Sequence, residues 1–62
     1  MGVESILGKM GYAKTEIGLS GQVQVGSELW TAEPYPGSGA ISKGDRIEVV
    51  DVKGLRLKVR KV

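Results

Sequence analysis

The C-terminal third of the chain alternates between apolar and polar residues. Leu55, Leu57 and Val59 occupy every second position, with basic residues between them, and Ile47 and Val49 follow the same rule upstream. A period of two is typical of a strand with one buried face, because successive side chains leave opposite faces of a sheet. The sequence therefore predicts two half-buried strands, which the turn signal at residues 53–54 joins into a hairpin.

The alternation changes phase within the first of these strands. After Val49, the apolar positions pass to Val50 and Val52. A shift of one residue would turn the rest of the strand inside out, unless a β-bulge accommodates the additional residue and bends the strand. We predict a bulge at residues 49–50, and a bent strand of this kind favours a curled sheet or a small barrel.

Composition limits the kinds of fold and of functional site that the chain can form. The chain has 62 residues, neither cysteine nor histidine, and a net charge of +2. A domain of this length buries only about 60% of the surface of its unfolded chain. Without these two residue types, disulfides, thiolate metal sites and histidine-based catalysis are excluded. The ten glycines favour short strands with frequent turns over helices.

Two further strands are predicted upstream, over residues 10–17 and 22–25, and a third begins at Glu28. Gly26 and Ser27 fit a two-residue hairpin loop, because a type II′ turn prefers glycine in its first position. This loop would pair Val23 with Trp30 on the core-facing side. Leu29 would then lie on the outer face.

Prolines and glycines in residues 33–39 end the third strand and form the longest irregular segment, after which Ile41 is expected to enter the core. The result is an all-β fold of five short strands. We predict a small five-stranded antiparallel barrel of the OB-fold type, with an SH3-like barrel as the alternative. Residues 1–7 are expected to be a flexible N-terminal tail and residues 8–62 the barrel domain.

An ordered set of short motifs is similar to the C-terminal soluble domain of the NfeD family over roughly residues 7–62. The set is Leu7-Gly8, Gly11-Tyr12-Ala13-Lys14-Thr15, Ser20-Gly21, Val23, Val25, Gly26, Leu29-Trp30-Thr31-Ala32, Ile41, Lys43-Gly44, Ile47, Val49-Val50, Val52, Gly54, Leu55, Leu57 and Val59. One departure is Leu19, where the family usually has proline.

The resemblance implies an OB-type barrel that a parent protein carries on transmembrane helices, beside the membrane. It also implies a partner of the stomatin or prohibitin type and a role in regulating membrane protease activity. Longer family members add a serine-protease domain. We therefore expect this chain to be a soluble, non-enzymatic interaction domain of a membrane-anchored protein, and we include self-association among its expected contacts.

The residues themselves offer little catalytic chemistry. A nucleophilic serine needs a neighbouring base, and Ser42 beside Lys43 fits a turn better than a catalytic pair. The carboxylates are scattered, and no pair has the spacing of acid–base or metal-binding motifs. We expect no catalytic residue, cofactor, metal site or small-molecule substrate.

The candidate interaction surface therefore consists of exposed residues, namely Leu29, Tyr35, Arg56, Lys58 and Arg60. The three basic residues alternate along the last strand and give it one cationic face. The alternative function is that of a single-stranded nucleic-acid-binding OB module. Such modules stack bases on aromatic side chains beside a basic groove. Since Trp30 is predicted to face the core, we do not expect nucleic acid to be the main partner.

Overall fold

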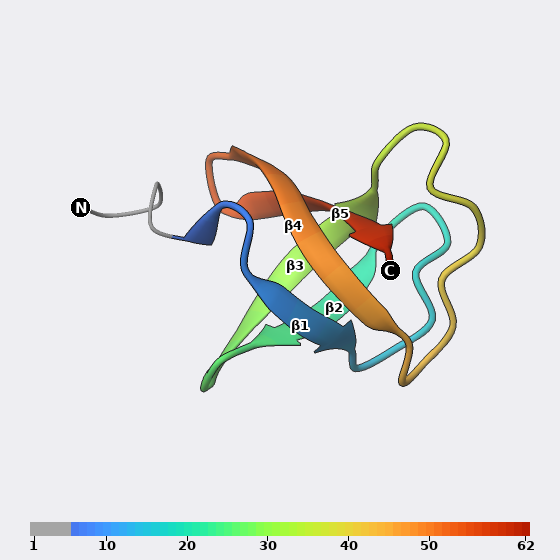
Figure 1. Cartoon of the computed structure of the whole chain (residues 1–62), viewed down its shortest axis with the longest axis horizontal. Coiled ribbons are helices and arrows are strands. Elements are labelled where there is room, and N and C mark those ends of the chain that lie inside the picture. Colours follow the sequence, from blue (N-terminus) through green and yellow to red (C-terminus); the bar gives the residue numbers. More distant parts are fainter. Residues whose placement is uncertain (1–5) are drawn as a thin grey trace.

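The computed structural model describes residues 6–62, which form a closed barrel with the strand order β1-β2-β3-β5-β4 (Figure 1). The strands are β1 (Met10–Ala13), β2 (Gly21–Val25), β3 (Glu28–Pro34), β4 (Arg46–Lys53) and β5 (Arg56–Lys61). The all-β, five-stranded OB-type barrel is confirmed. One pair departs from the expected antiparallel arrangement, because β3 and β5 run parallel. The connection over residues 35–45 carries the chain across the barrel, so that β5 returns in the direction of β3.

The predicted bulge is present in β4. Val49 pairs with Val59 and Asp51 pairs with Lys58, which leaves Val50 as the additional residue. On one side β4 pairs with β5 along its length, and on the other its first residues pair with β1. The bend allows one strand to join both neighbours and close the barrel.

The hairpin of β2 and β3 has the register that its loop predicts. Val23 pairs with Trp30 and the loop residues are Gly26 and Ser27. Gly26 has a φ of 63°, and Ser27 does not adopt a positive φ. A positive φ in the first loop position alone is the signature of a type II′ turn.

The first strand is shorter than predicted. It ends at Ala13 instead of continuing to residue 17. Ile17 instead forms an isolated antiparallel bridge with Ile41, and its N–H donates to the Ile41 carbonyl at 2.9 Å. Both side chains are buried, so the two long loops meet and cover one end of the barrel.

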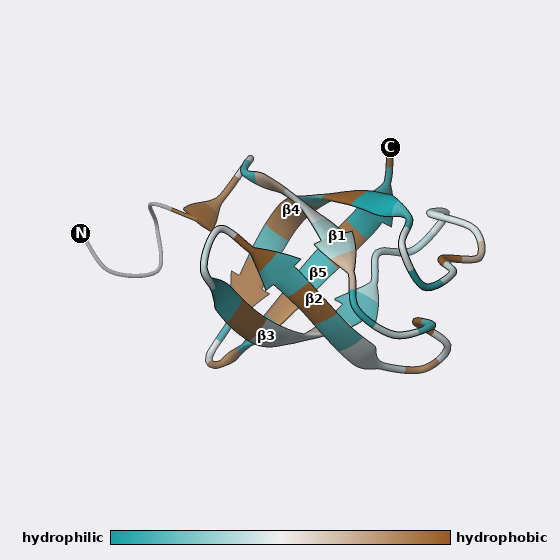
Figure 2. Cartoon of the chain, turned by 90° about the horizontal axis from the view of Figure 1, so that it is seen from below, coloured by the Kyte–Doolittle hydropathy of each residue, from teal (hydrophilic) through white to brown (hydrophobic). Residues whose placement is uncertain are grey.

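Buried apolar side chains line the interior, and hydropathy alternates along the strands (Figure 2). The cluster comprises Ile6, Ala13, Ile17, Val23, Val25, Ala32, Ile41, Ile47, Val49, Leu57 and Val59. Ile41 enters the core as predicted. Residues 1–5 of the predicted tail lie outside the described residues. Ile6 is 7% exposed, and the N–H of Gly8 donates to the Val49 carbonyl at 2.8 Å.

Candidate interaction surface

The predicted surface residues lie along two neighbouring strands. Thr31 pairs with Arg56 and Pro34 with Val59, so β3 and β5 form a parallel ribbon. Alternation places Arg56, Lys58 and Arg60 on the outer face of this ribbon. The structure therefore brings the three bases together in one row, as the period of two predicts.

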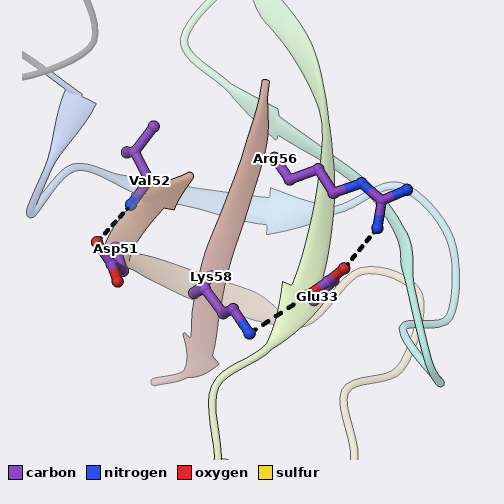
Figure 3. Close-up of polar contacts among 5 residues, drawn as sticks. All are labelled: Glu33, Asp51, Val52, Arg56 and Lys58. Carbon is purple, nitrogen blue, oxygen red and sulfur yellow. Dashed lines mark hydrogen bonds and ion pairs between the residues drawn. The ribbon is translucent and has the colours of Figure 1, made fainter. Parts of the chain in front are cut away.

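Glu33 on β3 lies within reach of two of these bases (Figure 3). Its carboxylate oxygens accept from Arg56 Nη1 at 2.7 Å and lie 3.3 Å from Lys58 Nζ. The hydrogen bond from Arg56, followed by that from Lys58, holds the pKa of Glu33 below its ordinary value. One acid on the neighbouring strand thus balances much of the positive charge at this end of the row.

A second acid balances the other end of the row. The Oε1 atom of Glu48 on β4 lies 2.7 Å from Arg60 Nη2 and accepts a hydrogen bond from Arg60 Nε at 3.0 Å. All three bases of the predicted cationic face are therefore ion-paired. Sequence reasoning missed these partners, although the cross-strand register of Glu48 with Arg60 would have indicated one of them.

The two apolar members of the predicted surface lie at opposite ends of the ribbon. Leu29 is 55% exposed near the start of β3, and Tyr35 is 45% exposed just after its end. They lie six positions apart along the chain, which corresponds to about 20 Å in an extended strand. The N–H of Tyr35 donates to the Val59 carbonyl at 2.7 Å, so this end is attached to β5. The apolar residues therefore flank the charged row and do not form one patch.

A second feature lies at the Leu29 end of the ribbon. An open groove of about 460 Å³ there is lined by Glu28, Leu29, Trp30, Thr31 and Leu55. Leu55, which was not among the predicted surface residues, is 82% exposed in the turn between β4 and β5. Its place in the apolar alternation of the last strand suggested a buried residue, but it precedes the first residue of β5.

Trp30 packs against the core cluster but is only half-buried, so the prediction that it faces the core is confirmed in part. Its indole Nε1 is buried and has no hydrogen-bond partner within residues 6–62. An unpaired buried donor costs about 1–3 kcal/mol. Trp30 thus contributes apolar contacts to the barrel and one wall to the groove.

Other polar contacts hold the loop over residues 35–45 against the end of β5. The Asp45 carboxylate accepts a hydrogen bond from the Ser42 N–H at 2.9 Å and lies 3.5 Å from Lys61 Nζ. The backbone hydrogen bond from Ser42 is the main cause that lowers the pKa of Asp45. Ser38 Oγ accepts from the Lys61 N–H at 3.1 Å, which fastens the proline-containing loop to the end of β5.

Residues 6–62 contain no group of three or more acidic, histidine or cysteine side chains that would hold a metal ion. Within that range, no helix has the length and apolar character needed to cross a bilayer.

A closed five-stranded barrel with this strand order, in which β3 and β5 run parallel, is a small OB-fold domain. Comparison with known families assigns it further. Residues 3–61 match the NfeD-like C-terminal, partner-binding domain, and the chain belongs to that family.

Individual relatives agree with this assignment. The chain is 38% identical over 56 residues to a membrane-bound protease of Pyrococcus horikoshii, covering 90% of this chain but only 12% of that protein. The C-terminal domain of a stomatin operon partner protein from the same organism superposes with a TM-score of 0.90 at 35% identity, covering 100% of this chain and 95% of the other.

A third relative shows the fold alone. It is the soluble domain of a membrane protein implicated in regulation of membrane protease activity from Corynebacterium glutamicum. The TM-score is 0.85 at 24% identity, with 94% of each chain covered.

Proposed function

We propose that this chain is a non-enzymatic binding module that engages a stomatin-like membrane protein through the outer ribbon of β3 and β5. Its parent would be a membrane-bound protein in which the barrel lies beside the membrane and contributes to regulating membrane protease activity. Two findings support the proposal. The family is described as a partner-binding domain, and the similar solved domain belongs to a stomatin operon partner protein.

The observation that carries the proposal is the composition of the outer ribbon. Arginine and tyrosine are enriched at protein interfaces, where apolar contacts are combined with charged ones. Arg56 and Arg60 lie in the row between the exposed side chains of Leu29 and Tyr35. A partner with acidic side chains opposite the row and apolar ones at its ends would match this pattern.

The absence of a protease role in this chain is part of the proposal. The similar membrane-bound protease is much longer, and this chain corresponds to only 12% of it. Among the described residues, Ser42 uses its main-chain N–H to bind Asp45, and its neighbour Lys43 is exposed. A serine–lysine pair would need a buried, neutral lysine to act as a base.

A titration tests the ribbon directly. The chain is titrated against a purified stomatin-like protein from the same organism, in parallel with the double variant Arg56→Glu/Lys58→Glu. The expected result is saturable binding by the native chain and at least a tenfold loss for the variant. A matched control is Lys14→Glu/Lys43→Glu, which reverses two exposed charges away from the ribbon.

A leucine pair provides a second control. Leu29→Asp should weaken binding, whereas Leu19→Asp should not, because Leu19 is 96% exposed in the loop between β1 and β2. No saturable binding by the native chain would reject the stomatin-like partner. Equal binding by native chain and charge variant would reject the ribbon as its site.

The nucleic-acid alternative has less support. Arg56, Lys58 and Arg60 of β5 are already paired with Glu33 and Glu48, so fewer positive charges remain for phosphates. Such a groove stacks successive bases on several aromatic faces beside the basic row, whereas Tyr35 is exposed at one end of the row and Trp30 packs against the core. A fluorescence titration with short oligonucleotides at low salt should leave the Trp30 emission unchanged.

A further inference from the structure

The start of β3 extends past the start of β5. β3 begins at Glu28, whereas the first β5 residue, Arg56, lies opposite Thr31. On its other side, β3 is paired with β2 from Glu28 onwards. Leu29 and its neighbours therefore have a strand on one side only, although the barrel is closed further along.

The main chain of Leu29 faces this open edge. The residues that flank a two-residue hairpin loop form a hydrogen-bonded pair, so the next pair, Gln24 with Leu29, exchanges no hydrogen bonds. The N–H and C=O of Leu29 therefore point away from β2. Tyr35 has the same phase, and its N–H donates to the Val59 carbonyl on the β5 side at 2.7 Å.

Apolar side chains surround this edge. The groove at Glu28–Thr31 is flanked by Leu29, which is 55% exposed, and by Leu55, which is 82% exposed. An unpaired strand edge beside apolar side chains is a template for the addition of another strand, and proteins usually protect such edges with charge or proline. Glu28 places one charge beside this edge, but Leu29 itself carries neither protection.

We propose that this edge pairs with the same edge of a second copy of the chain. In an antiparallel pair centred on Leu29, the two leucines exchange both of their hydrogen bonds around a twofold axis. Glu28 of each copy then lies opposite Trp30 of the other, so the two carboxylates do not face one another. One accessible N–H and C=O in each copy is enough for this arrangement, because the axis passes midway between the two Leu29 residues and each leucine donates to and accepts from the other.

The contact between the two copies buries a small area, so the affinity of the dimer is low. A few residues from each copy bury well under the ~800 Å² per partner of a standard interface, so the isolated domain associates weakly. Each copy also carries a net charge of +2, and this repulsion is screened by salt. The contact uses the strand edge and needs no other protein, so it goes beyond the proposed function.

Sedimentation analysis and amide exchange test the pairing. The whole chain is examined from micromolar to millimolar concentration at low and high salt. The expected result is a monomer–dimer equilibrium that strengthens with salt, while the exchange of the Leu29 amide slows as concentration rises. Concentration-dependent NMR shifts should be confined to the hairpin end at residues 28–31 and to residues 54–56.

Variants separate this edge from other surfaces. Leu29→Lys places a charge on the edge and should abolish the dimer, whereas Leu19→Lys should leave it unchanged. Lys58→Glu/Arg60→Glu, further along the ribbon, should also leave it unchanged, even where it weakens partner binding. The proposal is overturned by a monomer at every concentration, by a dimer that Leu29→Lys does not affect, or by Leu29 amide protection that appears only with a different protein bound.

Discussion

Replacing Gly11 with alanine tests how closely β1 must approach β2 to close the barrel. An alanine Cβ at this position would fall inside contact distance of the Gln24 carbonyl oxygen and 3.1 Å from Val25 Cγ2. The methyl of Val25 could move by changing its rotamer, but the carbonyl belongs to the main chain of β2. Relief therefore requires the two strands to separate where Tyr12 pairs with Gln24.

The loss of stability expected for Gly11→Ala depends on the kind of atom that must move. Overpacking of a core costs about 1–3 kcal/mol, and a main-chain obstacle places Gly11→Ala at the upper end. A domain of 62 residues at about 0.05–0.15 kcal/mol per residue has a total stability of roughly 3–9 kcal/mol. The substitution should therefore remove a third or more of the free energy of unfolding, and lower Tm by about 12–24 °C.

The control is the same substitution at a glycine with open surroundings. Gly18 has no atom within 4 Å of an added Cβ, and its φ is not positive. Gly18→Ala should be neutral or stabilise by up to about 1 kcal/mol, because alanine restricts the unfolded chain. Urea unfolding followed by Trp30 emission and circular dichroism compares the two. Stabilities that agree within about 0.5 kcal/mol would refute the steric reasoning.

Three further changes probe other parts of the molecule. Trp30→Phe removes the indole N–H, which has no partner among residues 6–62, so circular dichroism in urea should show that the free energy of unfolding falls by less than about 2 kcal/mol despite the smaller ring. A larger fall would mean that the N–H has a partner. Folding lowers the pKa values of Glu33 and Asp45. Both carboxylates therefore stabilise the fold when the pH lies above their ordinary pKa values of 4.5 and 3.8. This stabilisation is lost as the pH falls through the lowered pKa values of the folded state. Tm should therefore decline below about pH 4.5, and less steeply for Glu33→Gln/Asp45→Asn. Parallel curves of Tm against pH for the two proteins would contradict this. Deletion of Val50 removes the bulge but preserves the inward phase of Val52. The straighter strand should pair poorly with β1, and unaltered exchange of the Tyr12 amide would show that the bend is dispensable.

The features that the sequence predicted correctly depend on neighbouring residues. The phase change at Val49 and Val50 indicates a bulge without reference to any other strand, because only an additional residue keeps both apolar sets inside. Likewise, Gly26 and Ser27 determine the pairing of their hairpin, since a two-residue loop allows one register. The outer position of Leu29 follows from that register alone.

The features that it did not predict depend on distant parts of the chain. The direction of β3 relative to β5 is set by how residues 35–45 cross the barrel. The first strand ends early because Ile17 finds a partner in Ile41, which lies 24 positions away. Trp30 lies in the part of β3 that extends past β5, and it is partly exposed there. The period-two pattern identifies the face of a residue but not how far a neighbouring strand extends.

The bulge also determines the electrostatic character of the candidate surface. In the register that it sets, Glu48 lies opposite Arg60 and Asp51 opposite Lys58, while Glu33 approaches the same row from β3. Bases that look like a cationic face in the sequence are thus neutralised by acids on both neighbouring strands. A partner that uses this row must replace existing ion pairs, so the exchange gives little net affinity but penalises a partner whose charges are misplaced. On this basis, affinity would come from the apolar ends of the ribbon and selectivity from its centre.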